Sequence, residues 1–256
     1  MLEIPPSLET YRTAFEKTIV PYISLTVTEK KPSIYSSKFG GDPYLPLNID
    51  HPLDASGNPL HLLAQLNFSE LPPLTPFPQQ GMLQFYISMT DEVYGIDFEE
   101  PTNQANFRVL YHPEIIEDDS KRVTDFSYIQ TIHETHEDYS SPLYKEYCLL
   151  AHVEEEAISN GDYRFQSLIP EMNDDEEEDM MDVLGNDGHK IGGYAFFTQE
   201  DPRTYLPEGS YDVLLFQMDS IDGICWGDMG VGNFFISASD LQALNFTNVL
   251  YNWDCY

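Results

Sequence analysis

The segment Lys38-Phe39-Gly40-Gly41 returns 152 residues later as Lys190-Ile191-Gly192-Gly193. A second pair of segments keeps the same offset, because LLAQLN at residues 62–67 corresponds to LLFQMD at residues 214–219. Short apolar runs of this length are typical of buried strands. The two matches together predict that one structural unit occurs twice in the chain.

A third pair of segments completes the correspondence. GMLQFYIS at residues 81–88 matches GVGNFFIS at residues 230–237, with an offset of 149. Three motifs in one order predict a tandem duplication of a K-x-G-G, L-L-x-Q, F-[YF]-I-S unit. We place repeat A at about residues 22–90 and repeat B at about residues 186–240.

Much of the remaining pattern is typical of strands. Residues 22–28 alternate apolar and polar side chains, as a half-buried strand does. Further strands are predicted at residues 60–67, 82–88, 106–112, 211–218 and 232–237. Each repeat has too few strands to bury a face alone, so we expect one compact domain over residues 1–256. The expected fold is mainly β with a few helices, with roll-like antiparallel sheets built from the duplication.

Two helices are predicted outside the repeats' strands. Residues 6–19 carry apolar side chains at helical spacing and end before Pro21. Near the end of the chain, Ser239 and Gln242 match a capping box, which predicts a short helix after Ser239.

The four glycines of the repeated motif are expected to have a structural role. Gly40 and Gly41 in repeat A, and Gly192 and Gly193 in repeat B, form pairs. Glycine adopts positive φ angles and allows close backbone approach. We therefore expect a tight turn at each pair.

The repeated glutamines, Gln65 and Gln217, are candidate ligand-binding residues. A glutamine in a buried strand must find partners for its oxygen and its NH₂ group. One interpretation is that each glutamine holds a nearby backbone turn, such as its own glycine loop. The alternative is that the two glutamines line a cleft shared by the repeats.

The middle of the chain differs from the repeats. Residues 113–185 are rich in Asp and Glu, and we interpret them as an acidic, variable insert with short helical stretches. Seven of the nine residues at 174–182 are acidic, and like charges weaken a helix. We therefore expect residues 171–182 to be an exposed, mobile excursion with little role in the core. His133-Glu134-Thr135-His136 lacks the i,i+4 histidine spacing of zinc proteases and predicts two exposed histidines.

The overall charge limits the kinds of partner. The chain has 44 acidic and 12 basic residues, a formal net charge of −32. Such a surface repels phosphate backbones and anionic membranes, which argues against nucleic-acid binding and membrane attachment. It attracts basic surfaces, so we expect that any protein partner is basic.

Cysteine usage and the first residues favour a cytoplasmic setting. The three cysteines, Cys148, Cys225 and Cys255, are widely spaced, which is typical of reduced thiols. The N-terminal residues have neither the basic nor the apolar region of a signal peptide. No apolar run approaches the roughly 18 residues that a membrane span needs.

The sequence contains no convincing catalytic or cofactor motif. A nucleophile elbow, a Walker loop and a cysteine framework for zinc are all absent. Gly227, Gly230 and Gly232 reverse the dinucleotide fingerprint and precede a predicted strand instead of a helix. We therefore predict no catalytic residues, no cofactor and no metal site.

Trp226 and Asp228 are the remaining candidate binding residues. An aromatic side chain and an acid in a glycine-rich loop can form a recognition site. The alternative is that Trp226 covers the end of the core while Asp228 caps a turn.

The repeated motifs also resemble a known family, the YwqG-like bacterial proteins of unknown function. The resemblance covers nearly the whole chain apart from residues 113–185. It implies a mainly β, roll-like fold with an internal duplication, and it implies no activity. It also implies a link to toxin immunity, because some family members occur near toxin genes. The segments that carry it are KFGGDPYLP (38–46), LLAQLNFSELP (62–72), GMLQFYIS (81–88), KIGGY (190–194), DVLLFQMDS (212–220), WGDMGVGNFFIS (226–237) and SDLQALNF (239–246).

Two functions are compatible with these observations. The first is an acidic cytoplasmic monomer that acts by binding and not by catalysis. The second is an enzyme or small-ligand binder with a cleft between the repeats, using Gln65, Gln217 and Asp228. A deep pocket with convergent polar groups would favour the second function.

Overall fold

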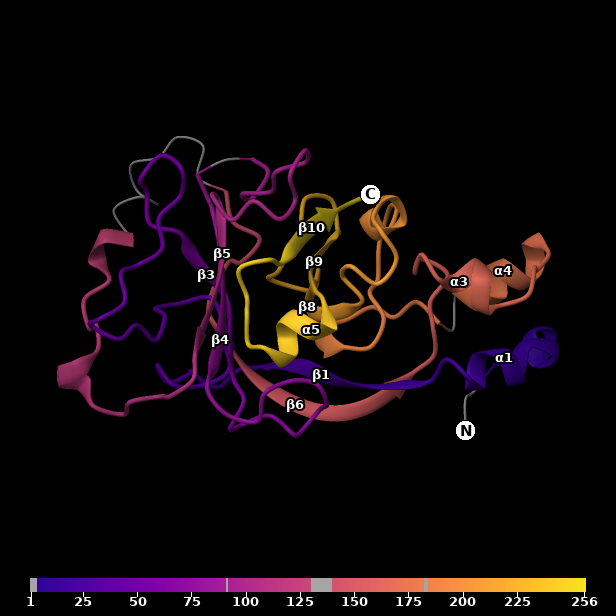
Figure 1. Ribbon diagram of the computed structural model, residues 1–256, viewed down its shortest axis with the longest axis horizontal. Helices are drawn as coiled ribbons and strands as arrows, with labels where there is room; N and C mark the ends of the chain where they lie inside the picture. Colours follow the sequence, from indigo (N-terminus) through magenta and orange to yellow (C-terminus); the bar gives the residue numbers. More distant parts are fainter. Residues whose placement is uncertain (1–3, 91, 130–139, 182–183) are drawn as a thin grey trace.

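The computed structural model describes residues 4–90, 92–129, 140–181 and 184–256, and ten strands in these ranges form one antiparallel sheet (Figure 1). Their order across the sheet is β10-β9-β8-β7-β1-β6-β2-β3-β4-β5. The expected fold class, mainly β with antiparallel pairing, is confirmed. The strands are β1 (Val20–Thr28), β2 (Lys38–Phe39), β3 (His61–Asn67), β4 (Met82–Ile87), β5 (Phe107–His112), β6 (Tyr147–Glu156), β7 (Lys190–Gly192), β8 (Val213–Asp219), β9 (Val231–Ile236) and β10 (Leu250–Asp254).

The two ends of the sheet share one arrangement. Outward from the central pair β1–β6, one half runs β7, β8, β9, β10 and the other runs β2, β3, β4, β5. In the first half Lys190 pairs with Gln217, and in the second half Lys38 pairs with Gln65. The β3–β4 and β8–β9 pairs each contain one register shift. The repeated motifs therefore occupy equivalent places on either side of the central pair.

The central pair contains a strand that the sequence pattern did not predict. Strand β6 pairs with β1 along nine residues, from Val20 with Glu156 to Thr28 with Cys148. The expectation of short helical stretches was wrong for this segment. Its acidic end misled the sequence interpretation, because glutamates are uncommon in strands. In the structure Glu154 and Glu155 are exposed, and Glu154 accepts hydrogen bonds from Tyr22 and Ser24 on β1. Glu156 is largely buried and pairs with Lys190.

Aromatic side chains from both halves meet inside the curled sheet. The ring of Phe85 lies 4.8 Å from that of Phe216 and 4.9 Å from that of Phe234. Tyr251 stacks on Phe234 at 4.6 Å and lies 5.1 Å from Phe107 on the opposite edge strand. One hydrophobic core therefore joins the two halves inside the sheet. Strands β3, β4 and β9 are buried on both faces because separate apolar clusters cover the other face, with Tyr86 in one half and Phe235 in the other.

The loop at residues 93–104 bridges the two edges of the sheet. On the β10 side, the N–H of Tyr251 donates to the carbonyl of Pro101 at 2.9 Å, and Nε1 of Trp253 donates to the carbonyl of Val93 at 2.8 Å. On the β5 side, Gln104 accepts from the N–H of Val109 at 2.9 Å. We call this loop the strap.

A small helical lobe lies beyond one end of β1 and β6 (Figure 1). It contains η1 (Pro6–Tyr11), α1 (Arg12–Glu16), α3 (Phe165–Leu168) and α4 (Asp174–Met181). Leu8, Phe15, Phe165 and Met180 form its own apolar cluster. The expected helix at 6–19 is thus a 3₁₀ turn followed by a short α-helix that ends at Glu16, because β1 begins at Val20.

The acidic run contains a helix, although its like charges were expected to weaken a helix there. Residues 174–181 form α4, in which Met180 is 1% exposed. Its acids also make contacts, because Glu176 accepts from the hydroxyl of Tyr11 at 2.8 Å and Asp179 from that of Ser7 at 2.5 Å. Tertiary contacts along one side of α4 outweigh the repulsion between its like charges.

The remaining short helices are η2 (Asp119–Lys121), η3 (Pro202–Tyr205) and α5 (Ala238–Gln242). The predicted capping box at α5 was displaced by two residues, since Ser237, and not Ser239, accepts from the N–H of Asp240. In the part of the chain that the structure describes, no helix has the length and apolar character to cross a bilayer.

Candidate functional site

In repeat A, the fully buried side chain of Gln65 holds the loop that carries the first glycine pair. Its Oε1 accepts from the N–H of Tyr44 at 2.9 Å and from Nε2 of Gln84 at 2.8 Å. Its Nε2 donates to the carbonyls of Ile34 and Ser36, both at 2.9 Å. These contacts connect the segments before and after the glycine pair.

In repeat B, Gln217 makes the equivalent contacts. Its Oε1 accepts from the N–H of Phe196 at 2.8 Å, and its Nε2 donates to the carbonyls of Asn186 and Gly188. Each of these partners lies 152 residues after the corresponding partner of Gln65. The two glutamines lie in separate halves, and the structure does not bring them together in a cleft.

The glycine pairs adopt left-handed backbone conformations. The φ angles are 63° and 72° at Gly40 and Gly41, and 73° and 70° at Gly192 and Gly193. A Cβ atom at Gly41 would collide with the carboxylate of Glu146, and one at Gly193 would collide with the carboxylate of Glu156. Both the φ angles and the space therefore favour glycine.

A buried lysine precedes each glycine pair. Nζ of Lys190 donates to Oε2 of Glu156 at 2.7 Å, and Nζ of Lys38 donates to the carbonyl of Asp42. Burial lowers the pKa of Lys38 to about 8, although the charges of Glu146 and Asp42 oppose the shift. Burial also lowers the pKa of Lys190 and raises the pKa of Glu156, and their ion pair opposes both shifts.

Each glycine pair borders a surface pocket. Pocket A, of about 310 Å³, adjoins Gly40 and Gly41, and pocket B, of about 260 Å³, adjoins Gly192 and Gly193. Five residues lining pocket A have counterparts that line pocket B, each 152 residues later: Gly40, Gly41, Asp42, His61 and Leu62 correspond to Gly192, Gly193, Tyr194, Val213 and Leu214. The shared backbone thus forms a pocket at the same place in both halves.

The other walls of the two pockets have different chemistry. Pocket A is also lined by Ser141, Lys145 and Glu146. Pocket B has an apolar wall and two charged side chains, Arg164 and Asp212. Residues of the apolar wall are Pro21, Leu74, Pro76, Phe77 and Leu214.

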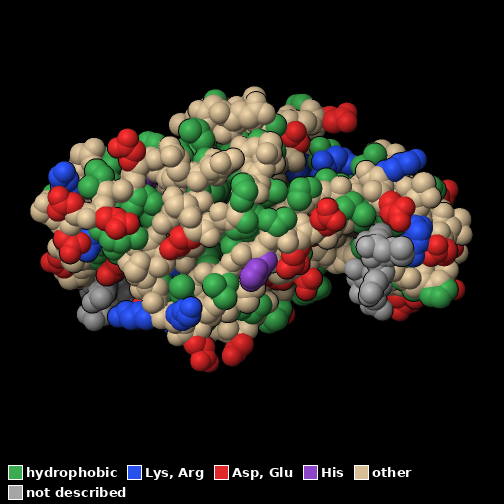
Figure 2. Space-filling view, turned by 90° about the horizontal axis from the view of Figure 1, so that it is seen from below, with side chains coloured by type: hydrophobic (Ala, Val, Ile, Leu, Met, Phe, Trp, Pro, Cys, Tyr) green, Lys and Arg blue, Asp and Glu red, His purple; other side chains and the backbone are tan. Residues whose placement is uncertain are grey.

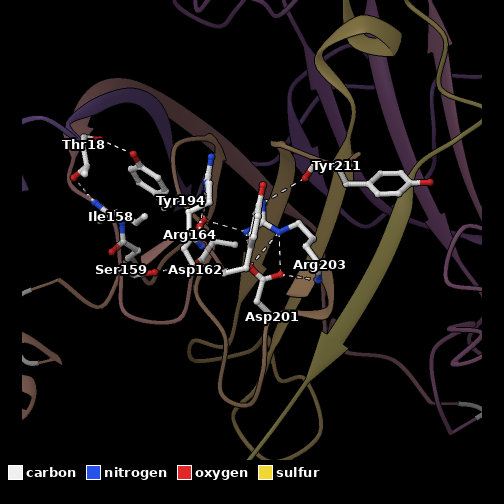
Figure 3. Close-up of polar contacts among 12 residues, drawn as sticks. Thr18, Ile158, Ser159, Asp162, Arg164, Tyr194, Asp201, Arg203 and Tyr211 are labelled. Carbon is white, nitrogen blue, oxygen red and sulfur yellow. Dashed lines mark hydrogen bonds and ion pairs between the residues drawn. The ribbon is translucent and has the colours of Figure 1, made fainter. Parts of the chain in front are cut away.

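A buried ionic network supports Arg164 at pocket B (Figure 3). The Arg164 guanidinium donates from Nε and Nη2 to both oxygens of Asp162, at 2.7 Å and 2.6 Å. Arg203 donates to the same Asp162 at 3.1 Å and to Asp201 at 2.7 Å. Burial raises the pKa of Asp162, but the hydrogen bond from Arg164 and the two guanidinium charges outweigh it and lower the pKa overall.

Aromatic rings also fix the Arg164 side chain. Its guanidinium lies 5.2 Å from the ring centres of both Tyr163 and Tyr194, within the range of cation–π attraction. The hydroxyl of Tyr194 in turn donates to the carbonyl of Thr18 at 2.6 Å. The guanidinium is therefore held in one orientation, with 28% of its side chain exposed.

Trp226 and Asp228 do not form a common site. Trp226 is fully buried, and its ring lies 5.6 Å from that of Tyr94 and 6.1 Å from that of Trp253. Asp228 is exposed on the following turn, where its carbonyl accepts from the N–H of Tyr256. The ring of Trp226 lies against Gly232, which leaves no space for a side chain there.

Two buried histidines are neutral at pH 7. Burial lowers the pKa values of His112 and His189 to about 4. Nε2 of His112 lies 2.8 Å from Oε1 of Gln84, and Nδ1 of His189 accepts from the N–H of Asp219 at 3.0 Å. Both histidines thus take part in the internal hydrogen bonding of their halves.

The histidine pair at residues 133–136 lies outside the described residues. Within the described ranges, no three His, Cys, Asp or Glu side chains form a group that could hold a metal ion.

The sequence interpretation missed the ionic network beside pocket B. A signal was present, because Asp162-Tyr163-Arg164 and Asp201-Pro202-Arg203 share the pattern D-x-R. The two segments are far apart in the chain, and the fold brings them together.

The fold and site define a protein with a curled antiparallel sheet, in which two equivalent loops are each held by a buried amide. The chain belongs to the family described as Domain of unknown function (DUF1963), whose match covers residues 37–255. A comparison with curated proteins gave no match.

Proposed function

We propose that the protein acts by binding a basic protein partner and does not catalyse a reaction. The observation that supports this proposal is that most of the few basic side chains are buried or paired with acids. Lys38 is buried, and six of the twelve lysines and arginines form ion pairs with Asp or Glu: Arg12, Lys121, Arg122, Arg164, Lys190 and Arg203. These ion pairs leave the net charge of −32 unchanged, and a cation that is already paired with a carboxylate repels a basic partner less than a free one does.

The distribution of charge supports long-range attraction. In Figure 2, acidic side chains are spread over the visible face, whereas basic side chains occur in a few places. Asp175 and Glu178 on α4 are exposed, as are Glu154 and Glu155 at the end of β6. Opposite charges increase the association rate, and salt screens them with a Debye length of about 8 Å at physiological ionic strength.

Association kinetics with a lysine-rich peptide test the proposal. We expect the association rate to fall steeply between about 50 and 300 mM salt while the dissociation rate changes little. The double variant Asp175→Asn/Glu178→Gln should lower the association rate at low salt. It removes two charges from α4 without touching the contacts of Glu176 and Asp179.

The charge-matched control is Glu114→Gln/Glu117→Gln, which neutralises two exposed acids near η2, at the other end of the molecule from α4 (Figure 1). It should slow association less than the α4 variant does. Tight binding that is independent of salt would refute the electrostatic proposal. Equal effects of the two variants would refute steering by α4.

The proposal includes a monomeric protein in the cytoplasm. The resemblance to the YwqG-like bacterial proteins favours one form of this function, immunity against a basic toxin. Light scattering after size-exclusion chromatography tests the monomeric state.

A second candidate function is the binding of a small ligand in a pocket beside a glycine pair. The observation that favours it is pocket B, where a fixed guanidinium and a carboxylate line one apolar pocket. The sequence suggests Gln65, Gln217 and Asp228 as the residues for such a function. The glutamines are fully buried on two different strands, β3 and β8, where they hold their own loops. The residues that line pocket B therefore support ligand binding better than the glutamines do.

A further inference from the structure

Pocket B combines one fixed cation, one carboxylate and an apolar wall. We propose that it binds a free α-amino acid with an apolar side chain. This inference gives the ligand class for the small-ligand function and depends on it, but it is independent of the basic partner.

Arg164 supplies the contact for the ligand's carboxylate. Asp162 occupies the guanidinium edge formed by Nε and Nη2. Among the described residues, none accepts a hydrogen bond from Nη1, so the edge formed by Nη1 and Nη2 is available. A guanidinium can donate two parallel hydrogen bonds to a carboxylate from such an edge.

The orientation of Arg164 is set before a ligand arrives. Its carboxylate partner Asp162 is completely buried and is also held by Arg203. Tyr163 and Tyr194 hold the guanidinium through their rings. A side chain that is already ordered loses little conformational entropy on binding, which favours affinity for a small ligand.

Asp212 supplies the contact for the ligand's ammonium group. Its Oδ1 accepts from the N–H of Ala238 at 3.1 Å, and within the described part of the chain Oδ2 has no hydrogen-bond donor. A ligand with only a negative charge would be repelled by Asp212, and one with only a positive charge would be repelled by Arg164. The pair of charges therefore selects a zwitterion.

The apolar wall and the size of the pocket determine which ligand side chain pocket B can hold. Leu74, Phe77 and Leu214 are buried residues that line the pocket together with Pro21 and Pro76. A volume of about 260 Å³ is below the usual range of about 300–1,000 Å³ for pockets that bind drug-sized ligands. The pocket thus fits a single amino acid, such as leucine or phenylalanine, better than a peptide.

Calorimetric titration of the full chain with L-phenylalanine and L-leucine tests the inference. The comparison ligands are 3-phenylpropionate, which lacks the ammonium group, and phenethylamine, which lacks the carboxylate. We expect both amino acids to bind, and each comparison ligand to bind at least about tenfold more weakly.

Three variants test the residues. Arg164→Lys keeps the charge but removes the bidentate edge, Asp212→Asn removes the ammonium partner, and Val213→Trp fills the pocket from β8. Each should weaken phenylalanine binding by about tenfold or more. The matched control is Arg122→Lys, since Arg122 is also paired with an acid, Asp119, and lies over a tyrosine ring outside the pocket. Urea unfolding of each variant checks that the fold is retained.

The outcomes distinguish a failure of the amino-acid inference from a failure of small-ligand binding in pocket B. If one comparison ligand binds as tightly as phenylalanine, or if Asp212→Asn leaves binding unchanged, the amino-acid inference is wrong but small-ligand binding in pocket B remains. If none of the four compounds binds, the amino-acid inference is refuted. If Val213→Trp leaves binding unchanged, the ligand binds outside pocket B, and both the inference and the pocket-B function are refuted. The salt-dependent association with the basic peptide is measured separately and is unaffected by either result.

Discussion

Lys190 and Glu156 form an ion pair of 2.7 Å between β7 and the end of β6, with side chains only 1% and 11% exposed. The other oxygen of Glu156 accepts from the N–H of Tyr194, also at 2.7 Å. This ion pair therefore holds the backbone before and after Gly192 and Gly193. Because these two glycines and Tyr194 line pocket B, it also holds one wall of that pocket.

Removing the lysine of this pair should strongly destabilise the fold. Lys190→Met leaves the Glu156 carboxylate buried without its cation, and we expect a loss of about 3–5 kcal/mol in the free energy of unfolding. Urea denaturation measures the loss. Lys121→Met is the control, because Lys121 and Asp118 form an exposed pair 3.9 Å apart, and it should cost less than about 1 kcal/mol. Similar costs for the two variants would contradict the prediction.

The two repeated glutamines should contribute similarly to stability. Gln65→Leu and Gln217→Leu each leave one backbone N–H and two carbonyls, buried or part-buried, without the glutamine as a partner. We expect a cost of about 3 kcal/mol or more for each, since one unsatisfied buried group costs about 1–3 kcal/mol. The exposed Gln79→Leu serves as the control. A large cost in one half and none in the other would show that the equivalent contacts are not equally important.

Acidic pH should destabilise the protein through His189. Its pKa falls from 6.5 to about 4 because of burial, so the unfolded chain binds a proton between these values while the folded chain does not. Stability due to neutral His189 is complete above pH 6.5 and decreases as the pH falls towards 4. The loss between pH 7 and pH 5 should be about 2 kcal/mol.

The variant His189→Asn should lack this part of the pH dependence. Urea unfolding at pH 7 and pH 5 gives the difference between wild type and variant, which removes the contribution of the carboxylates common to both. The exposed His152→Gln is the control. If His189→Asn kept the pH dependence of the wild type, the lowered pKa of His189 would not be the cause of the acid destabilisation.

The acidic helix α4 should contribute to stability through the buried side chain of Met180. Met180→Ala should cost about 2–4 kcal/mol, because it leaves a cavity in the apolar cluster of the helical lobe. Asp175→Asn/Glu178→Gln should be neutral or slightly stabilising, because it lowers the repulsion between like charges. Thermal unfolding of both variants measures the difference in stability between them. A neutral Met180→Ala would mean that α4 does not stabilise the lobe.

Sequence reasoning located the strands that carry strong local patterns. The apolar runs at β3, β4, β8 and β9 needed no tertiary information, and the repeated motif indicated that Lys38 and Lys190 are equivalent. It failed where tertiary contacts outweigh local preference. The glutamates at the end of β6 obscured a strand that exists because β1 pairs with it, and the charges of α4 obscured a helix that exists because η1 lies beside it.

The candidate site could be predicted only in part. The glycine pairs were located from the motif, but Arg164 lies outside both repeats and reaches pocket B through the fold. The role of Gln65 as a holder of its own loop was one of two open interpretations. The shared strand order and the equal offsets of the glutamines' partners support our interpretation of a tandem duplication, which stays a prediction about the origin of the chain.

The strap at residues 93–104 has a consequence for the behaviour of the protein in concentrated solution. Edge strands with free N–H and C=O groups can recruit strands from other molecules and begin aggregation. Here the strap pairs with β10 through Pro101 and with β5 through Gln104, so both edges are partly occupied within one molecule. Cutting the strap would free both edges at once, and the molecule would then offer two places at which neighbouring copies could add their strands.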